Sequence, residues 1–221
     1  MATQPRETVP DEAGRPHRYA ALLGPAERLP GKPFTDVKET WADLLVMTAM
    51  LAGEREIAAG WAADVEGPGI SETARDGSRR LLAVPDGRAL LAARDVTAVG
   101  FFGTLREGVD HTVLFAYERS IAQTFPEYAP AGFLSYFDVG PEHGRYGNLI
   151  LFWTPEVPGA WHANPAHRLA VAAAPDHYTH IRLHRGRIPG PFLGVGTLDL
   201  EQTQYLEFES GAVWRALRRY R

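Results

Sequence analysis

The chain of 221 residues is long enough for one domain with an extension, and an apolar content of 45% excludes a mainly disordered protein. Its net charge of -4 provides no basic surface for nucleic acid or acidic lipid, and no segment approaches the roughly 20 apolar residues that span a membrane. The absence of cysteine excludes disulfides, thiolate nucleophiles and cysteine-ligated metals. We therefore expect a cytoplasmic protein that binds neither nucleic acid nor membrane.

The first part of the chain is predicted to be an extension of the main domain. Residues 1–18 are polar and contain prolines without periodicity, which is typical of a disordered tail. Residues 19–95 are expected to form helices and a hairpin packed on the main domain. Asp36 predicts the start of a helix because its side chain can cap free N–H groups, and Gly53 is expected to break that helix.

A β-hairpin is predicted next. Residues 80–84 and 88–92 resemble strands, and Pro85-Asp86-Gly87 between them is typical of a tight turn because Asp-Gly tolerates positive φ angles.

Residues 96–221 carry the pattern of the main domain. Apolar periodicity predicts the order strand, helix, strand, strand, helix, strand, which is the ferredoxin-like β-α-β-β-α-β module of an α+β fold. Both helices would cover one face of the sheet, so the other face would be open, and a homodimer is the simplest way to cover it. A strand over 204–208 and a basic C-terminal helix on which Trp214, Leu217 and Tyr220 share a face are expected to follow. The expected strands are 96–105, 133–139, 148–154 and 178–185, and the expected helices are 110–125 and 164–174.

The stretch from residue 147 to 186 concentrates the chemistry, since it holds five of the eight histidines. Asn164 and Pro165 predict a helix start that places His167 on the helix. In the following strand, the alternation predicts that Ile181 and Leu183 share one face. The opposite face is expected to carry the polar residues Tyr178, His180, Arg182 and His184.

The polar strand face has two interpretations. Arg182 and a neutral His184 would form a hydrogen-bonding wall for a phenolate or enolate oxygen, or else Arg182 is a structural ion pair, with Glu118 and Asp138 as candidate partners. His180 and His184 would lie about 13 Å apart on a strand, too far to share a zinc ion, so we expect no metal site.

His167 has three interpretations: a packed core histidine, a general acid or base, or the axial ligand of a haem lying against small side chains. Aromatic residues nearby are either core or the lining of a pocket for a planar polycyclic compound. These residues are Tyr136, Phe152, Trp153 and Trp161.

The element order, with Trp161, His162, Pro165 and His167 opening the second helix, resembles the dimeric α+β barrel superfamily. Within it, the chain is similar to the antibiotic-biosynthesis monooxygenases, including ring-opening oxygenases of angucycline pathways. This resemblance implies a homodimeric oxygenase of secondary metabolism that oxidises a planar polycyclic aromatic polyketide, with no cofactor or with reduced flavin supplied by a flavin reductase. The expected catalytic residues are His167, Arg182 and His184, and the expected substrate-binding residues are Tyr136, Phe152, Trp153, Trp161, Tyr178 and His180.

Two alternatives accompany this hypothesis. The segments ANPAH and HIRLHRG resemble those of the haem-containing aldoxime dehydratases, which implies haem binding with His167 as the proximal ligand. A non-enzymatic reading is a small-molecule-binding dimer whose polar strand face forms the subunit interface.

Overall fold

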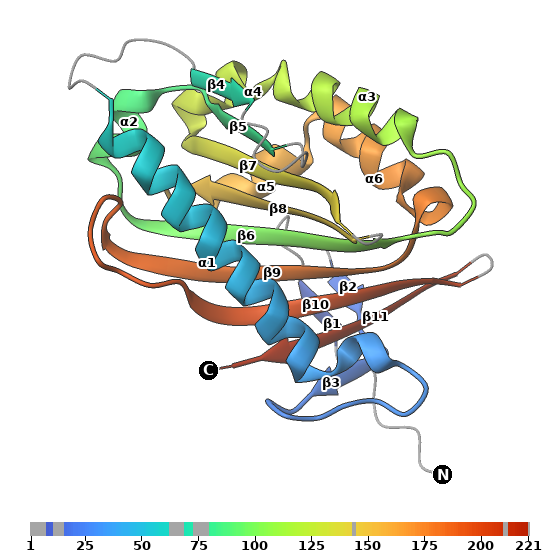
Figure 1. The fold of residues 1–221 in the computed structure, drawn as a ribbon. Helices are drawn as coiled ribbons and strands as arrows, with labels where there is room; N and C mark the ends of the chain where they lie inside the picture. The colour runs from blue at the N-terminus through green and yellow to red at the C-terminus, as the bar shows by residue number, and fades with distance from the viewer. Residues whose placement is uncertain are drawn as a thin grey trace.

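The computed structural model of the protein describes residues 8–10, 16–61, 69–72, 80–142, 145–209 and 212–220. Across these residues the fold is mixed α+β, with a nine-stranded sheet as its centre (Figure 1). In order across the sheet, the strands are β3 (Ala21–Leu23), β11 (Ala212–Arg219), β10 (Asp199–Glu209), β9 (Tyr178–Pro191), β6 (Arg94–Leu105), β8 (Arg145–Phe152), β7 (Phe133–Glu142), β5 (Arg80–Val84) and β4 (Gly69–Glu72).

The predicted strands of the main domain are present as β6, β7, β8 and β9, although β9 continues six residues beyond its predicted end. They are neighbours in the order β9-β6-β8-β7, and each adjacent pair is antiparallel. The helix after β6 is α3 (Thr112–Ala122), and the helix between β8 and β9 is α6 (Pro165–His177). These two helices contact each other on one face of the sheet, behind it in Figure 1. Short helical turns complete this layer: α4 (Phe125–Tyr128), η2 (Ala129–Ala131) and α5 (Val157–His162).

The long helix α1 (Val37–Ala59) follows the 3-10 turn η1 (Pro33–Thr35), and it begins where the sequence predicts. The Asp36 carboxylate accepts a hydrogen bond from the Lys38 N–H at 3.0 Å. The predicted break at Gly53 is wrong, because α1 continues for six further residues to Ala59. A glycine costs a helix only about 1 kcal/mol, and burial of Glu54 and Ala58 after Gly53 continues the packed face.

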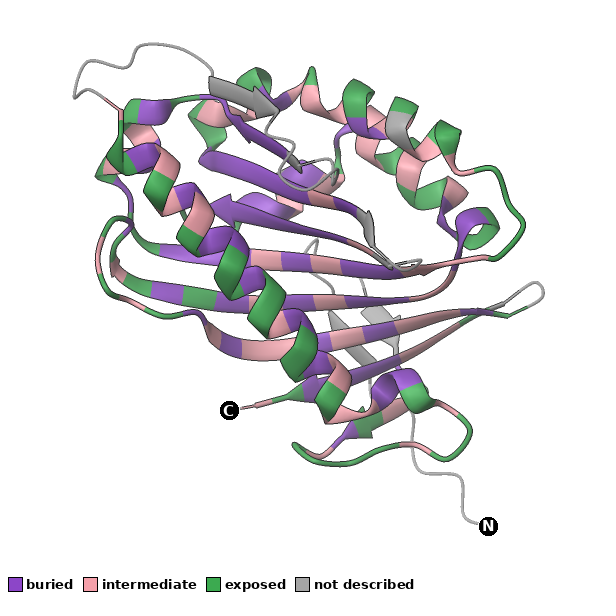
Figure 2. Cartoon of the chain, in the orientation of Figure 1, coloured by how far each residue is buried: buried purple, intermediate pink, exposed green. Residues whose placement is uncertain are grey.

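The prediction of an open sheet face is also wrong, because α1 crosses that face (Figure 1). Met47, Met50 and Leu51 of α1 are buried in the largest apolar cluster, together with Leu149 and Leu151 of β8. Figure 2 shows buried residues on the side of α1 toward the sheet and exposed residues on its outer side. The sheet therefore has helices on both faces, α1 on one and α3 with α6 on the other.

The predicted hairpin over 80–92 is not formed. Its first half is β5, but its second half is the helix α2 (Gly87–Ala92), and β5 pairs with β4 and β7 instead. The Asp86 side chain accepts a hydrogen bond from the Ala89 N–H at 2.9 Å, which is the N-cap geometry of a helix. The Arg-Ala-Leu-Leu-Ala segment is rich in strong helix formers, and the capping Asp decides between turn and helix.

The predicted C-terminal helix is a strand. Residues 212–219 form β11, which pairs antiparallel with β10 and parallel with β3. In β11 the side chains of Ala216 and Arg218 point to one face of the sheet, and those of Leu217 and Arg219 point to the other. The apolar spacing that suggests one face of a helix is therefore also compatible with a strand. Backbone pairing with two neighbouring strands outweighs the helical propensity of the segment.

Helix α6 begins as predicted, with the side-chain amide oxygen of Asn164 accepting hydrogen bonds from the N–H groups of Ala166 and His167. The prediction that it ends before Pro175 is wrong, because the helix includes Pro175 and runs to His177. Pro175 lies in the last turn, where the missing N–H removes a single helical bond.

Within the predicted tail, β1 (Thr8–Pro10) and β2 (Pro16–Arg18) pair as a separate two-stranded sheet. No helix formed by the described residues has the length and apolar character needed to cross a membrane.

Glu54 is a buried carboxyl group in the interface between α1 and the sheet, fully shielded from solvent. Neither of its carboxyl oxygens has a hydrogen-bond partner among the described residues. Burial raises the pKa of Glu54 to about 7, and the nearby Ser135 hydroxyl and Arg55 charge counter only part of this effect. The folded protein therefore holds a proton that the unfolded chain releases near pH 4.5.

We predict that Glu54→Gln removes a pH-dependent loss of stability. Wild-type stability falls as pH rises from about 4.5 through 7, by about 3 kcal/mol in total, because the carboxylate must ionise inside the core. Urea unfolding should give similar free energies for both proteins at pH 5 and a more stable variant at pH 8. The exposed Glu56→Gln on the same helix is the control, and an equal effect of Glu54→Gln at both pH values would contradict the assignment.

Candidate functional site

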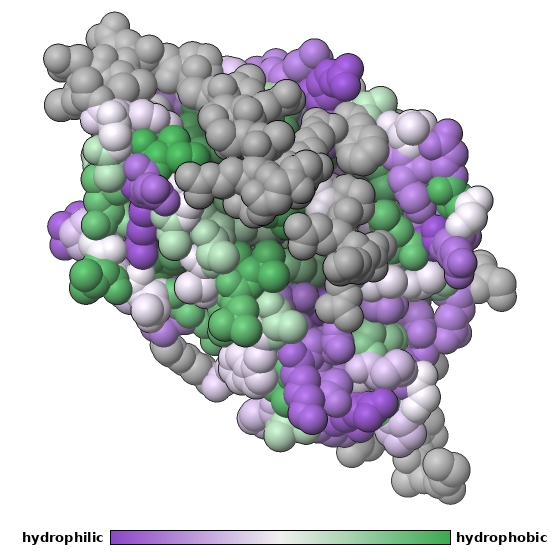
Figure 3. Space-filling view, in the orientation of Figure 1, coloured by the Kyte–Doolittle hydropathy of each residue, from purple (hydrophilic) through white to green (hydrophobic). Residues whose placement is uncertain are grey.

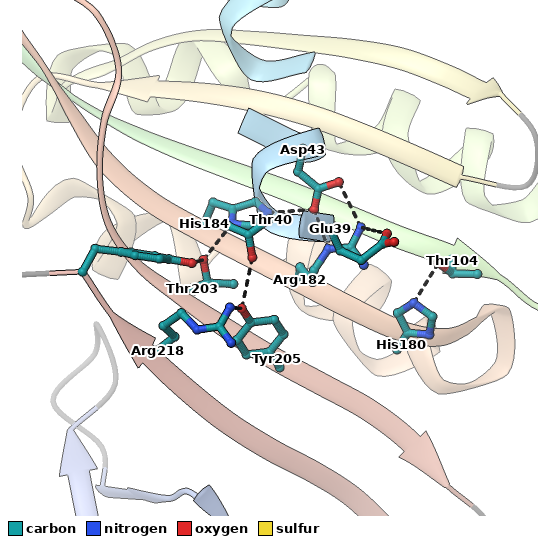
Figure 4. A network of polar contacts seen from close by, with 11 residues as sticks. Glu39, Thr40, Asp43, Thr104, His180, Arg182, His184, Thr203, Tyr205 and Arg218 are labelled. Carbon is teal, nitrogen blue, oxygen red and sulfur yellow. Dashed lines mark hydrogen bonds and ion pairs between the residues drawn. The ribbon is translucent and has the colours of Figure 1, made fainter. Parts of the chain in front are cut away.

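The first polar group lies between α1 and the sheet (Figure 4). Arg182 and His184 of β9 both bind Asp43 of α1, and each of the three residues is at most 3% exposed. The Arg182 guanidinium donates to both carboxylate oxygens, with an Nη2–Oδ1 distance of 2.9 Å. The His184 Nε2 atom lies 2.9 Å from Asp43 Oδ2, and its Nδ1 lies 2.9 Å from the Thr203 hydroxyl, which in turn lies 3.1 Å from the Tyr220 hydroxyl. We call these five residues the Asp43 cluster.

The protonation states of the Asp43 cluster follow from its surroundings. Burial alone would raise the pKa of Asp43, but hydrogen bonds from His184 and Arg182 outweigh burial and hold the pKa below its usual value. Burial lowers the pKa of His184, so its imidazole is neutral. A neutral His184 donates from Nε2 to the carboxylate, accepts at Nδ1 from Thr203, and leaves Thr203 to accept from Tyr220.

A second chain of hydrogen bonds lies beside the Asp43 cluster in Figure 4. Arg218 is fully buried and donates to the Tyr205 hydroxyl at 2.6 Å, which leaves that hydroxyl to donate to Thr40 of α1 at 3.0 Å. Arg218 also donates to backbone carbonyl groups, including that of Thr35 at 2.8 Å. This chain ties β10 and β11 to the start of α1.

These contacts change the expected role of Arg182 and His184. The predicted partners of Arg182, Glu118 and Asp138, are wrong, because Arg182 pairs with Asp43. Its bidentate ion pair and the two hydrogen bonds of His184 use the groups that a substrate oxyanion would need. Because α1 of the same chain covers both side chains, they also do not form a subunit interface. The Asp43 cluster therefore fixes α1 across the sheet.

The other two polar residues predicted on this face of β9, His180 and Tyr178, lie on different faces of the sheet. The His180 ring stacks on Phe34 at a centroid distance of 4.7 Å and bonds the Thr104 hydroxyl at 2.9 Å, on the α1 side. Tyr178 is on the opposite face, so its predicted place beside Arg182 is wrong. The register between β6 and β9 shifts just after Tyr178, and this irregularity reverses the side on which that residue points.

The second polar group lies on the opposite face, where α3 covers β7 and β8. Glu118 of α3 accepts a hydrogen bond from the Tyr146 hydroxyl at 2.9 Å, and the hydroxyl groups of Tyr146 and Tyr136 are also 2.9 Å apart. Asp138 lies beside them, with Oδ2 at 3.2 Å from the Tyr146 hydroxyl, and Asn148 donates to Tyr136 at 3.3 Å. We call these five residues the carboxyl cluster.

The surroundings of Asp138 favour its protonated form. Burial, a hydrogen bond with Glu118 and the charge of Glu118 together raise the pKa of Asp138 to about 9. Burial also raises the pKa values of Tyr136 and Tyr146 well above 10. Asp138 is therefore favoured as a carboxylic acid at neutral pH, because a second negative charge at this buried place is unfavourable.

The carboxyl cluster also presents an unused acceptor. The Asn148 Oδ1 atom is buried, and no described residue donates a hydrogen bond to it. A buried amide oxygen normally has a donor, so this atom is suited to accept from a hydroxyl group of a ligand. The cluster thus places two carboxyl groups, two phenol hydroxyl groups and a buried amide oxygen close together.

Aromatic rings adjoin the carboxyl cluster through Tyr136. Its ring lies 5.2 Å from Phe125, which lies 5.6 Å from Trp161. Phe133 is 5.0 Å from Trp161 and 5.5 Å from Phe152. The predicted residues Tyr136, Phe152 and Trp161 therefore lie together in one apolar cluster. Trp153 is 44% exposed and His180 is on the other face, so these two predicted residues are apart from them.

His167 lies at the edge of this aromatic cluster. Its ring is 5.4 Å from that of Trp161 and 5.4 Å from that of His162. Burial lowers the pKa of His167 to about 4, so the ring is neutral, and its Nδ1 has no partner among the described residues. A neutral imidazole can ligate iron, but the rings of Trp161 and His162 already lie against this one. Haem binding by His167 stays a prediction.

Asp43 is the functional side chain that our sequence analysis missed. The signal was present, because Asp43 is the single charged residue between Glu39 and Glu54 in an otherwise apolar helix. A lone charge on such a helix needs a partner, and Arg182 is the residue whose burial required one. Glu118 and Asp138, the expected partners of Arg182, contact Tyr146 instead.

Comparisons with protein-family models, with curated proteins and with solved structures found no match. Among the described residues, no three His, Asp or Glu side chains are grouped so that they could hold a metal ion. The chemistry of this chain must therefore be argued from its own geometry.

We predict that Asp43→Asn destabilises the protein by about 3–5 kcal/mol, because it leaves the Arg182 charge buried without a counter-charge. Denaturant unfolding at pH 7 measures the change. The control is Asp36→Asn at the N-cap of the same helix, where asparagine caps equally well and stability should be almost unchanged. Equal, small effects of the two substitutions would show that the buried pair does not hold α1.

Proposed function

We propose that this protein is an enzyme that removes a proton from a small phenolic or enolic substrate bound between α3 and the sheet. The observation that carries this proposal is the carboxyl cluster, in which the Tyr146 hydroxyl lies 2.9 Å from Glu118 Oε1 and 3.2 Å from Asp138 Oδ2. Burial and the neighbouring Glu118 raise the pKa of Asp138. Such a pair is suited to acid–base catalysis when one member accepts a proton and the other donates one. The Asn148 Oδ1 atom, to which no described residue donates, suits a substrate hydroxyl group.

The reaction that we propose is the oxygenation of a planar polycyclic aromatic compound, as in the antibiotic-biosynthesis monooxygenases that the sequence resembles. Proton removal by Glu118 converts a phenol or an enol into an electron-rich anion, which can pass an electron to molecular oxygen. Asp138 and Tyr146 would stabilise the developing negative charge by hydrogen bonds. Phe125 and Trp161 supply aromatic surface next to the carboxyl cluster for the rings of such a substrate.

We further propose that residues 94–191 form a ferredoxin-like module and that α1 belongs to an N-terminal extension which caps it. The strand order β9-β6-β8-β7, with α3 and α6 together on one face, supports this assignment. Under this proposal, the substrate site lies between the sheet and the two helices of the module. Arg182 and His184 then act at a distance from the substrate, by holding the sheet and α1 together.

We predict that Glu118→Gln and Asp138→Asn each lower kcat by about 100-fold or more, because each removes a proton-transfer group. The measurement is oxygen uptake with an anthrone or a related polyphenol, alongside the melting temperature of each variant. The exposed Glu127→Gln in α4 is the matched control and should retain full turnover. Unchanged turnover in both cluster variants would overturn the proposed function.

We also propose that the protein is a homodimer joined through the outer face of α1. Trp41, Leu45 and Val46 are exposed on this face, Leu45 to 73%. Figure 3 shows hydrophobic side chains gathered along the course of α1. The charge of Asp43 points toward the sheet, so the outer face of α1 carries no charged side chain from residue 40 to 53. An uncharged apolar face of this kind is complementary to a second apolar face. A second copy of α1 provides that surface in an isologous contact.

We predict that Leu45→Glu converts the dimer into a monomer, because it places a charge at the centre of the contact. Light scattering coupled to gel filtration measures the mass. Leu169→Glu, at the similarly exposed Leu169 of α6, is the control and should remain dimeric. A wild-type protein that is monomeric at micromolar concentration would refute the proposed interface without affecting the acid–base site.

A further inference from the structure

Two histidines outside both polar clusters face each other near the start of α3 and the end of α6. His111 is the residue before α3, and His177 is the last residue of α6. The Nδ1 atoms of the two rings are 3.4 Å apart. His177 is 7% exposed and His111 is partly exposed. The pair therefore lies near the surface, and neither ring extends fully into solvent.

The backbone around the pair is held in place from both sides. The Arg106 N–H donates to the His177 carbonyl group at 2.8 Å, and the Arg106 guanidinium donates to the Pro175 carbonyl group at 2.9 Å. The His111 carbonyl group accepts from the Leu114 N–H in the first turn of α3. The two imidazole rings are thus positioned before any ligand binds.

The hydrogen bond at the far side of His111 fixes its tautomer. The Nε2 atom lies 2.9 Å from the Arg106 carbonyl oxygen, and only a protonated Nε2 can bond a carbonyl group. In the neutral ring, Nδ1 is therefore an unprotonated acceptor that points at His177. A histidine that ligates a metal through one ring nitrogen usually donates a hydrogen bond from its other ring nitrogen, often to a backbone carbonyl group.

We propose that His111 and His177 bind one divalent transition-metal ion through their Nδ1 atoms. Two imidazole nitrogens at about 2.0–2.1 Å from a tetrahedral zinc ion are about 3.3–3.4 Å apart. The observed separation of 3.4 Å is close to this spacing, and a small turn of the two facing rings would aim both Nδ1 atoms at one ion. Binding requires the proton on His177 Nδ1 to move to Nε2 of the same ring, and both rings then coordinate through Nδ1 in the neutral form without net loss of a proton.

The chemistry of the pair selects the class of ion. Imidazole nitrogen suits Zn²⁺, Cu²⁺ and Ni²⁺ rather than Mg²⁺ or Ca²⁺. The Asp110 carboxylate is held next to the pair by the Thr112 N–H and hydroxyl groups, at 2.9 and 3.0 Å, and adds a negative charge that favours a cation. Two protein ligands leave the other positions to water, so the expected affinity is micromolar. The proposal is independent of the proposed enzymatic function.

The test is titration of the full-length protein, without a histidine tag, with ZnCl₂ by isothermal calorimetry, and with CuCl₂ by electron paramagnetic resonance. We expect one Zn²⁺ per chain and hyperfine coupling of Cu²⁺ to two imidazole nitrogens. His111→Ala and His177→Phe should each weaken Zn²⁺ binding by at least about 10-fold and reduce the coupling to one nitrogen. The His177→Phe variant keeps an aromatic ring in the buried position, so that folding is preserved.

His162→Ala is the matched control, because His162 contacts a histidine at the other end of α6 and should leave the titration unchanged. Melting temperatures of the variants verify that each one is folded. The absence of stoichiometric Zn²⁺ binding, or binding that survives both substitutions of the pair, would overturn the proposal and leave a simple hydrogen bond between two histidines.

Discussion

The ion pair between Asp43 and Arg182 is the contact on which the arrangement of this fold depends. Both groups are almost completely removed from water, and losing either partner would leave the other charge buried alone. An apolar contact between α1 and the sheet would tolerate sliding, whereas a bidentate pair with a third hydrogen bond from His184 permits one position. Such buried polar groups add specificity more than net stability.

The two faces of the sheet carry different polar groups. On the α1 face, Asp43, Arg182 and His184 bind one another and are closed to solvent (Figure 4). On the α3 face, the pKa of Asp138 is raised beside Glu118, and no described residue donates to Asn148 Oδ1. The proposed acid–base chemistry therefore belongs to the α3 face, while Arg182 and His184 are held by Asp43 on the α1 face.

Periodicity was sufficient to predict the four central strands and the capped starts of α1 and α6. Errors arose where one pattern serves two structures. Asp86-Gly87 suits a hairpin turn and a helix cap, and residues 213–220 suit a helix until β10 supplies a pairing edge. The site was harder to predict, because Asp43 lies 139 residues from Arg182 and a register shift reverses Tyr178. The lone charge in α1 shows that Asp43 needs a partner but does not identify it, and the register shift leaves no local mark in the sequence.

The protonation state of Asp138 at neutral pH tests the central claim most directly. The two proteins to compare are Glu54→Gln and the double variant Glu54→Gln with Asp138→Asn. Their infrared difference spectrum isolates the carbonyl stretch of the Asp138 carboxylic acid. The account predicts a protonated-carboxyl band at pH 7 that disappears as pH rises through about 9. A spectrum with only carboxylate bands at pH 7 would contradict it, because Glu118 and Asp138 would then lack the proton on which the proposed chemistry rests.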